Sequence, residues 1–348
     1  MVATSHVLVF MKSSMENIFF FLDYFHSIKS MKRALKKIPS AVKNYVSGAS
    51  LAATGTSNSF NVPNAALGND LTSFTISGSD DVDAAVASAK IGQQQWRQTP
   101  PAEKAHVMRR AASILRERVD ELAALECLDT GRPLKEMEYD IACAWECLEY
   151  MSSICQTTAT SGEHILLGGS EPGASFGFTR REPLGVCAGI GAWNYPLQSA
   201  VWKSAPALAC GNALVFKPAE NTPLLALALA EVYTEAGIPN GCFNVVLGDG
   251  STGSLLSSHP DIAKVSFTGS VNTGQKVYQS SAATMKSVTM ELGGKSPLII
   301  MEDAHIENAV SAAMMANWYS CGEVCSNGTR VFVQENIMEQ FLNRLMER

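Results

Sequence analysis

The sequence predicts an α/β protein built around a parallel β-sheet with helices on both faces. Between Val186 and Met290, short apolar runs alternate with helical segments, as in strand–helix–strand units. Polar, charged or glycine residues directly follow each apolar run, at the edge where such sheets bind ligands. With 348 residues and 46% hydrophobic side chains, the chain is long enough for two domains with filled cores.

Composition excludes several functions. A net charge of −6 gives no reason to expect a nucleic-acid partner. The nine cysteines form neither a disulfide framework nor a zinc pattern, and Cys143 and Cys147 are interpreted as core thiols. The six histidines are scattered, so no metal site is predicted. Free cysteines suit a reducing compartment, and a cytoplasmic location is expected.

Residues 1–70 are interpreted as a basic extension. No acidic residue occurs between Tyr24 and Asn69, whereas lysine and arginine recur there with serine and alanine. Two interpretations stay open: a mitochondrial transit peptide, with Met31 as an alternative start, or an unstructured extension. In either case disorder is expected up to about Asn69. The apolar run Ile18–Phe21 is too short for a membrane span, which needs ~20 residues.

Three helices and a hairpin are predicted before the sheet. Ser79 is the expected N-cap of the first helix, the second starts near Pro101, and the third runs from Ile141 to Met151. All three are interpreted as packing elements without a chemical role. Within residues 162–185, two extended runs separated by glycines and prolines predict a bridging hairpin; the runs are Ile165–Leu167 and Phe176–Arg180.

Five strands are predicted for the parallel sheet, namely Val186–Ala192, Ala213–Lys217, Phe243–Leu247, Lys264–Phe267 and Ser287–Met290. A leucine-rich helix over Leu224–Ala236 and helices near Thr252 and Val271 belong to the connections. The residues after the strands are therefore the candidates for a site.

Taken singly, these candidates have ordinary alternatives. Glycines and hydroxyls from Gly269 to Thr273 lie at a helix N-terminus that could bind a diphosphate, although such residues are often simple caps. Lys217 and Glu220 could hold ribose hydroxyls or form a solvated ion pair. Asn194 could donate to an oxyanion or be a turn residue. Cys325 could be a nucleophile helped by Glu291 as a base, or a core thiol.

The order of five motifs resembles the NAD(P)-dependent aldehyde dehydrogenases. The motifs are Trp193-Asn194-Tyr195-Pro196, Lys217-Pro218-Ala219-Glu220, Phe267-Thr268-Gly269-Ser270, Glu291-Leu292-Gly293-Gly294-Lys295-Ser296-Pro297 and Gly322-Glu323-Val324-Cys325. The resemblance runs from about Ser79 to the C-terminus. Tracts around Thr179–Cys187 and Asn327–Val333 are most similar to the branch acting on 4-trimethylaminobutyraldehyde and betaine aldehyde.

The resemblance implies a Rossmann-like fold, NAD as cofactor and a role for each candidate. Cys325 would attack the aldehyde, Asn194 would hold the oxyanion, and Glu291 would activate the water that hydrolyses the thioester. The cofactor side would comprise Lys203, Lys217, Glu220 and the loop Gly269, Ser270, Val271, Asn272 and Thr273, with Lys203 also matching a proton-transfer lysine. The implied domains are 71–161 with 186–292 for NAD, 162–185 as the hairpin, and 293–348 as the start of a catalytic domain.

Two departures from the family pattern accompany the resemblance. Glu323 stands where the family usually has glutamine, and a carboxylate pointing at Cys325 would oppose thiolate formation. Family members continue beyond the position of Arg348, with a Glu-x-Phe-Gly-Pro segment and an oligomerisation strand. The catalytic domain is therefore expected to be incomplete, and the 348-residue product inactive and poorly soluble.

Two functions from different classes follow. One is NAD-dependent oxidation of an aldehyde, a small-molecule substrate; the other is a non-catalytic NAD-binding fragment. A thiol acyltransferase is disfavoured because no histidine lies near Cys325. Four aromatic residues near the motifs, Trp193, Trp202, Trp318 and Tyr319, could hold a trimethylammonium group by cation–π attraction or could be core.

Overall fold

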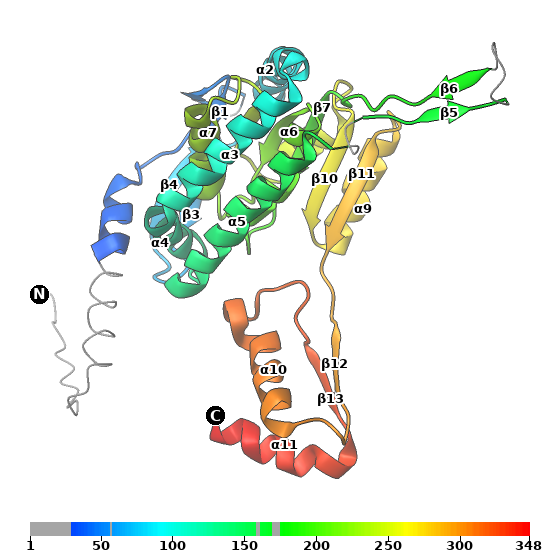
Figure 1. Ribbon diagram of the computed structural model, residues 1–348. Helices are drawn as coiled ribbons and strands as arrows, with labels where there is room; N and C mark the ends of the chain where they lie inside the picture. Colours follow the sequence, from blue (N-terminus) through cyan, green and yellow to red (C-terminus); the bar gives the residue numbers. More distant parts are fainter. Residues whose placement is uncertain (1–28, 56–57, 158–160, 169–174) are drawn as a thin grey trace, which may run out of the picture.

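The computed structural model describes residues 29–55, 58–157, 161–168 and 175–348, and a seven-stranded sheet forms its centre (Figure 1). Five strands are parallel: β7 (Val186–Ile190), β8 (Ala213–Lys217), β9 (Phe243–Val245), β10 (Lys264–Gly269) and β11 (Ser287–Leu292). The strand order is β11-β10-β7-β8-β9-β1-β2. β7, β8 and β9 are buried along their whole length, as expected for a sheet covered on both faces. The predicted parallel sheet is confirmed.

The first two strands of this sheet come from the segment predicted to be disordered. β1 (Asn44–Val46) pairs antiparallel with β9, and β2 (Ala49–Leu51) pairs with β1. Asn44 is buried; its Oδ1 accepts the Leu247 N–H at 2.8 Å, and its Nδ2 donates to Ser77 Oγ at 2.8 Å. A following hairpin, β3 (Ser59–Pro63) with β4 (Asp70–Thr75), buries Val62 and Phe74.

The boundary at residue 70 is therefore wrong for residues 29–55 and 58–69. Basic composition predicts disorder, but β1 and β2 extend the edge of the central sheet at β9, and β3 pairs with β4 in a separate two-stranded sheet. Residues 29–37 are helical and pack against α4 through a small apolar cluster. The first 28 residues lie outside the described part, so the transit-peptide interpretation stays a prediction there.

Two helical layers cover the sheet. One face carries α2 (Ser79–Gln98), α8 (Gly250–Ser258) and α9 (Val271–Ala282). The other carries α6 (Pro196–Ala209) and α7 (Leu224–Ala236), backed by α3 (Pro101–Glu117), α4 (Val119–Thr130) and α5 (Leu134–Ile154). The predicted helices are present, with the predicted second helix divided at Arg118 into α3 and α4.

The cap of α2 differs from the prediction by one residue. Ser79 is the first helical residue, and the N-cap is Gly78. The Asp81 carboxylate accepts the Gly78 N–H at 3.0 Å and also the Gly55 N–H at 3.0 Å. An aspartate in the first turn therefore supplies the capping interaction that was expected from the serine.

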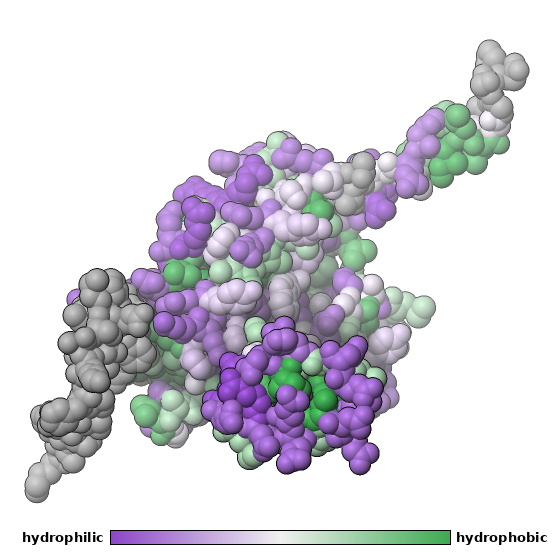
Figure 2. Space-filling view, turned by 60° about the horizontal axis from the view of Figure 1, so that its bottom comes forward, coloured by the Kyte–Doolittle hydropathy of each residue, from purple (hydrophilic) through white to green (hydrophobic). Residues whose placement is uncertain are grey.

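The predicted hairpin is confirmed as β5 (His164–Leu166) paired antiparallel with β6 (Phe176–Phe178). It projects away from the helices in Figure 1, and Figure 2 shows hydrophobic surface along it. Leu166 and Phe178 are 68% and 72% exposed. The predicted tip, residues 169–174, lies outside the described residues.

A smaller unit follows β11. β12 (Pro297–Ile300) and β13 (Arg330–Val333) form a separate parallel pair, packed with α10 (Ile306–Trp318) and α11 (Glu335–Glu347). Its core is a cluster of its own around Ile300, Val310, Ala313 and Phe341. Figure 1 shows this unit below the body, and Figure 2, which brings it forward, shows hydrophobic surface inside a hydrophilic rim.

Candidate active site

A cavity of about 920 Å³ lies beyond the carboxyl ends of the central parallel strands. Its wall comes from the ends of β7, β8, β10 and β11, from the glycine-rich start of α8, and from the loop before β13. The lining includes Asn194, Lys217, Glu220, Gly253, Gly269, Ser270, Thr273, Glu291, Glu323 and Cys325. Most of the predicted site residues therefore share one cavity, as the strand-end argument predicts.

Cys325 reaches the cavity from the loop after the 3-10 helix η2 (Tyr319–Gly322). Ser320, Cys321 and Gly322 all have positive φ, so the chain turns sharply before the thiol. Cys325 is exposed. Its backbone lies against the Glu291–Gly294 segment, because a Cβ on Gly294 would stand 3.1 Å from the Cys325 carbonyl oxygen.

Asn194 stands between β7 and α6, and its side chain points to the loop that carries the thiol. Its Nδ2 donates a short hydrogen bond to the Glu323 carbonyl oxygen. An amide nitrogen has two hydrogens, so a second can be donated to a bound group. The backbone carbonyl of Asn194 in turn accepts from Arg132 Nη1 at 2.9 Å.

Glu291 lies near the end of β11, in register with Thr268 of β10. Lys203 is behind this wall: its Nζ donates to Thr268 Oγ1 at 2.5 Å. Burial lowers the pKa of Lys203 to about 8, while the charge of Glu291 acts in the opposite direction. Lys203 does not line the cavity; it borders a second hollow on the α6 side of the sheet.

Lys217 and Glu220 border the opposite end of the cavity. The Lys217 ammonium is buried and donates to the carbonyl oxygens of Pro218 at 2.7 Å and Gly248 at 2.8 Å. Glu220 lies 3.7 Å away. Burial lowers the pKa of Lys217, and the charges of Glu220 and Asp249 oppose this. The lysine is thus fixed by the fold, whereas the side chain of Glu220 is 43% exposed.

The predicted diphosphate loop opens α9 as expected. Ser270 is the N-cap, and its Oγ accepts the Thr273 N–H at 3.2 Å. Gly269, Ser270 and Thr273 line the cavity, whereas Val271 and Asn272 do not and are exposed. Of the predicted loop, only Gly269, Ser270 and Thr273 therefore place the N-terminus of α9 at the cavity.

Glu323 also lines the cavity, two residues before the thiol. Burial raises the pKa of its carboxyl, and the positive charge of Arg132 partly offsets this. Burial therefore disfavours the charged form of Glu323, which is the form that would oppose a thiolate at Cys325.

Of the four aromatic residues proposed for substrate binding, Trp193 and Trp202 line the cavity, and Trp318 and Tyr319 do not. Trp193 and Trp202 are 45% and 54% exposed, so the structure does not bury them as core.

Sequence reasoning missed the contribution of α5. Arg132 precedes the helix, and Glu136 and Asp140 follow on it at intervals of four residues. Arg132 contacts the Asn194 carbonyl and pairs with Asp140, and Glu136 contacts the Ser320 backbone. Glu126 of α4 is buried beside them, and burial raises its pKa to about 8. The four-residue spacing of charges was the available signal, but the helix was interpreted as packing alone.

The described residues, 29–55, 58–157, 161–168 and 175–348, contain no group of three or more histidine, cysteine, aspartate or glutamate side chains arranged to bind a metal. No helix among them has the length and apolar character required to cross a membrane.

Residues 52–348 match the aldehyde dehydrogenase family. The chain is 52% identical over 308 residues to human 4-trimethylaminobutyraldehyde dehydrogenase and covers 60% of it, using 88% of this chain. It is also 52% identical to 4-trimethylaminobutyraldehyde dehydrogenase A of Danio rerio, covering 59% of that protein with 88% of this chain. The chain thus spans about three-fifths of the length of these curated relatives.

Solved structures agree with this match. Betaine aldehyde dehydrogenase from Staphylococcus aureus in complex with NAD+ superposes with a TM-score of 0.85 at 32% identity, over 93% of this chain and 63% of that one. An aldehyde dehydrogenase from Bacillus cereus gives a TM-score of 0.85 at 37% identity, over 90% of this chain and 64% of that one.

Proposed function

Because the chain belongs to the aldehyde dehydrogenase family, we propose that its cavity oxidises an aldehyde to a carboxylic acid with NAD as hydride acceptor. The observation that carries the proposal is the shared cavity, which is lined by a thiol, an amide donor and a carboxylate together with a buried lysine and a nearby glutamate. These are the groups needed for covalent attack, oxyanion stabilisation and water activation.

Gly253 of α8 lines the cavity of about 920 Å³ beside Lys217. A Cβ on Gly253 would make ordinary van der Waals contact with Lys217 Cε at 3.6 Å and Ile190 Cδ1 at 3.8 Å, so the start of the helix lies close to this lysine. Lys217 and Glu220 would hold ribose hydroxyls, and the α9 N-terminus would hold the diphosphate. Bound there, NAD supplies the site that accepts hydride. The named NAD+ complex of the S. aureus relative supports this choice.

The protein's own groups would act in two stages. Cys325 releases its thiol proton to solvent, its Sγ adds to the carbonyl carbon, and the second N–H of Asn194 Nδ2 stabilises the negative oxygen that forms. Loss of hydride leaves a thioester on Cys325. Glu291 then takes a proton from water as its oxygen attacks the thioester, the C–S bond breaks, and Glu291 returns the proton to the sulfur as the acid leaves.

For the substrate we propose an aldehyde with a trimethylammonium group. The names of the 52%-identical relatives and of the betaine aldehyde dehydrogenase support this class. In the cavity, the partly exposed rings of Trp193 and Trp202 are available to a cation. Cation–π attraction to partly exposed rings contributes ~0.5–1 kcal/mol, so the charged aldehyde should be preferred over its uncharged carbon isostere by about threefold or more.

The test combines NAD binding with turnover on the purified chain. Calorimetry measures the NAD affinity, and NADH absorbance measures oxidation of 4-trimethylaminobutyraldehyde and of its carbon isostere. Turnover of order 1–10 s⁻¹ with a preference for the charged aldehyde supports the proposal. NAD binding without turnover of any aldehyde would instead support the non-catalytic NAD-binding alternative, and turnover without preference would remove the trimethylammonium assignment.

A further inference from the structure

The corner between α4 and α5 brings an arginine into the interior beside the candidate active site. Gly131 closes α4 with a φ of +77°, and Pro133 is the N-cap of α5. Arg132 between them is fully buried. A buried guanidinium needs partners for its charge and for its hydrogen-bond donors.

Arg132 has a partner for its charge and a hydrogen-bond acceptor for Nη1. Its Nη2 lies 2.6 Å from Asp140 Oδ2, an ion pair in which both side chains are almost wholly buried. Its Nη1 donates to the Asn194 carbonyl oxygen at 2.9 Å, and its guanidinium lies 4.1 Å from the centre of the Tyr195 ring. A planar guanidinium held by a carboxylate and stacked on a ring has little freedom. It therefore fixes the backbone at Asn194 and Tyr195.

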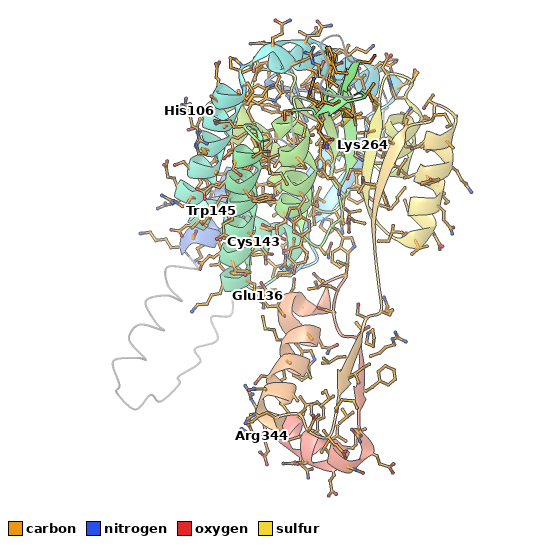
Figure 3. The ribbon with its side chains drawn as sticks, turned by 45° about the vertical axis from the view of Figure 1, so that its right-hand side comes forward. His106, Glu136, Cys143, Trp145, Lys264 and Arg344 are labelled. Atoms are coloured by element: carbon orange, nitrogen blue, oxygen red, sulfur yellow. The ribbon has the colours of Figure 1, made fainter. Side chains whose placement is uncertain are left out.

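Glu136 makes the corresponding contact with the loop of the thiol. It lies in the first turn of α5, four residues after Arg132, at the end of the helix that faces α10 in Figure 3. Its Oε2 accepts the Ser320 N–H at 2.8 Å. Ser320 and Cys321 have φ of 58° and 55°, a backbone region that residues with a Cβ rarely adopt. Such a conformation persists only where neighbouring groups hold it.

We propose that Arg132 and Glu136 are positioning residues for the reaction, acting from the α4–α5 corner and the first turn of α5 on the two halves of the catalytic centre. Arg132 holds the Asn194 backbone so that its amide meets the developing oxyanion, and Glu136 holds the turn that delivers Cys325. Neither residue lines the cavity. The inference rests on the proposed function, but its structural half can be tested without turnover.

The test without turnover is hydrogen–deuterium exchange read by mass spectrometry. Arg132→Met should speed exchange at least threefold in the peptide around Asn194, and Glu136→Ala should do so around Ser320 and Cys321. Lys135→Met, exposed on the same turn, is the matched control and should change neither peptide. Unchanged exchange in both peptides would overturn the inference, whatever the outcome for aldehyde oxidation.

The test with turnover is a double-mutant cycle. Arg132→Met should lower kcat about 10- to 100-fold with KM within threefold, because a misplaced donor affects the transition state more than binding. In an Asn194→Ala background the same change should cost less than threefold, since the group that Arg132 orients is gone. If the kcat losses of the two single variants multiply in full in the double variant, Arg132 acts independently of Asn194, and the assignment is overturned.

A conservative variant keeps the double-mutant cycle interpretable if Arg132→Met does not fold. Arg132→Lys keeps a positive charge near Asp140 and a donor for the Asn194 carbonyl, and it should recover turnover to within about tenfold of wild type. If Arg132→Met does not fold, Arg132→Lys replaces it in the cycle, and a loss that persists unchanged in the Asn194→Ala background refutes the proposal. If the wild-type chain oxidises no aldehyde, the proposed function fails, and the exchange experiment alone decides on Arg132 and Glu136.

Discussion

Gly294 and Cys325 are in backbone contact: a Cβ added at Gly294 would stand 3.1 Å from the carbonyl oxygen of Cys325. This distance is tighter than ordinary van der Waals contact, so one of the two segments would have to move. Because Gly294 has no side chain, the segment that begins at Glu291 can lie directly against the loop that carries Cys325. Two motifs that are separate in the sequence become one site through this contact.

Gly294→Ala should therefore reduce turnover by about 10- to 100-fold, because displacing a nucleophile by a fraction of an ångström spoils its attack geometry. The matched control is Gly293→Ala, where an added Cβ meets nothing within 4 Å. Steady-state kinetics of the two variants, with melting temperatures for both, provide the measurement. Equal losses in the two would show that the contact with Cys325 does not matter.

Cys325→Ala should abolish aldehyde oxidation, with a loss of ~10³-fold or more, while NAD affinity stays within about threefold of wild type. The thiol is needed for covalent attack but not for the dinucleotide. Cys321→Ala is the control, since Cys321 is an exposed thiol in the same loop that does not line the cavity. Residual turnover above about a hundredth in Cys325→Ala would exclude it as the nucleophile.

Glu291→Gln should accumulate acyl-enzyme, because an amide cannot take the proton from the attacking water. A rapid-mixing experiment is expected to show a burst of NADH close to one per site, followed by a slow steady state. Mass spectrometry should then find the acyl group on the peptide containing Cys325. A progress curve without a burst, slowed at every step alike, would argue against a deacylation role.

The sheet was predictable from the sequence because apolar runs of strand length alternate with helical ones. The strands from Val186 to Leu292 follow the predicted bounds within two residues. The segment containing β1 was not predictable in this way, because its order depends on pairing with β9 across about two hundred residues of chain. Local composition, dominated by lysine and serine, contains no sign of that partner.

Most residues of the candidate site were also predictable, since parallel strands bring their carboxyl ends to one edge. Arg132 and Glu136 were not, because their role depends on how the α4–α5 corner packs against Asn194 and Ser320. The direction of the Lys203 side chain was likewise not predictable from the sequence. Its position in the sequence matches the site, but its ammonium lies behind the wall on Thr268.

The cavity wall at Gly253 should control NAD binding. Gly253→Leu would extend a side chain from α8 into the cavity beside Lys217, and NAD affinity should fall at least tenfold. Gly253→Ala is the matched control: its Cβ fits at ordinary contact distance, and alanine stabilises a helix interior by up to ~1 kcal/mol over glycine. Calorimetric titration of both variants checks the expectation. Unchanged NAD affinity in a folded leucine variant would place the dinucleotide elsewhere.

Glu126 should make the folded protein less stable as the pH rises. Its carboxyl is fully buried in α4, and burial, reinforced by the charge of Asp140, raises its pKa from 4.5 to about 8, with Arg132 acting in the opposite direction. The unfolded chain ionises this group above pH 4.5, whereas the folded protein keeps it protonated up to about pH 8. The unfolded state therefore binds fewer protons across this window, and stability falls as the pH increases through it.

Replacing Glu126 with glutamine removes this titration while keeping the shape of the neutral carboxyl. At pH 5 the variant and the wild type should be similarly stable, because the folded carboxyl is neutral there. Between pH 5 and 8 the free energy of unfolding should decrease more steeply in the wild type, by an amount of order 1 kcal/mol per pH unit. Urea denaturation at several pH values measures both curves. Parallel curves over that range would mean that Glu126 is ionised in the folded protein and that its charge is compensated by Arg132.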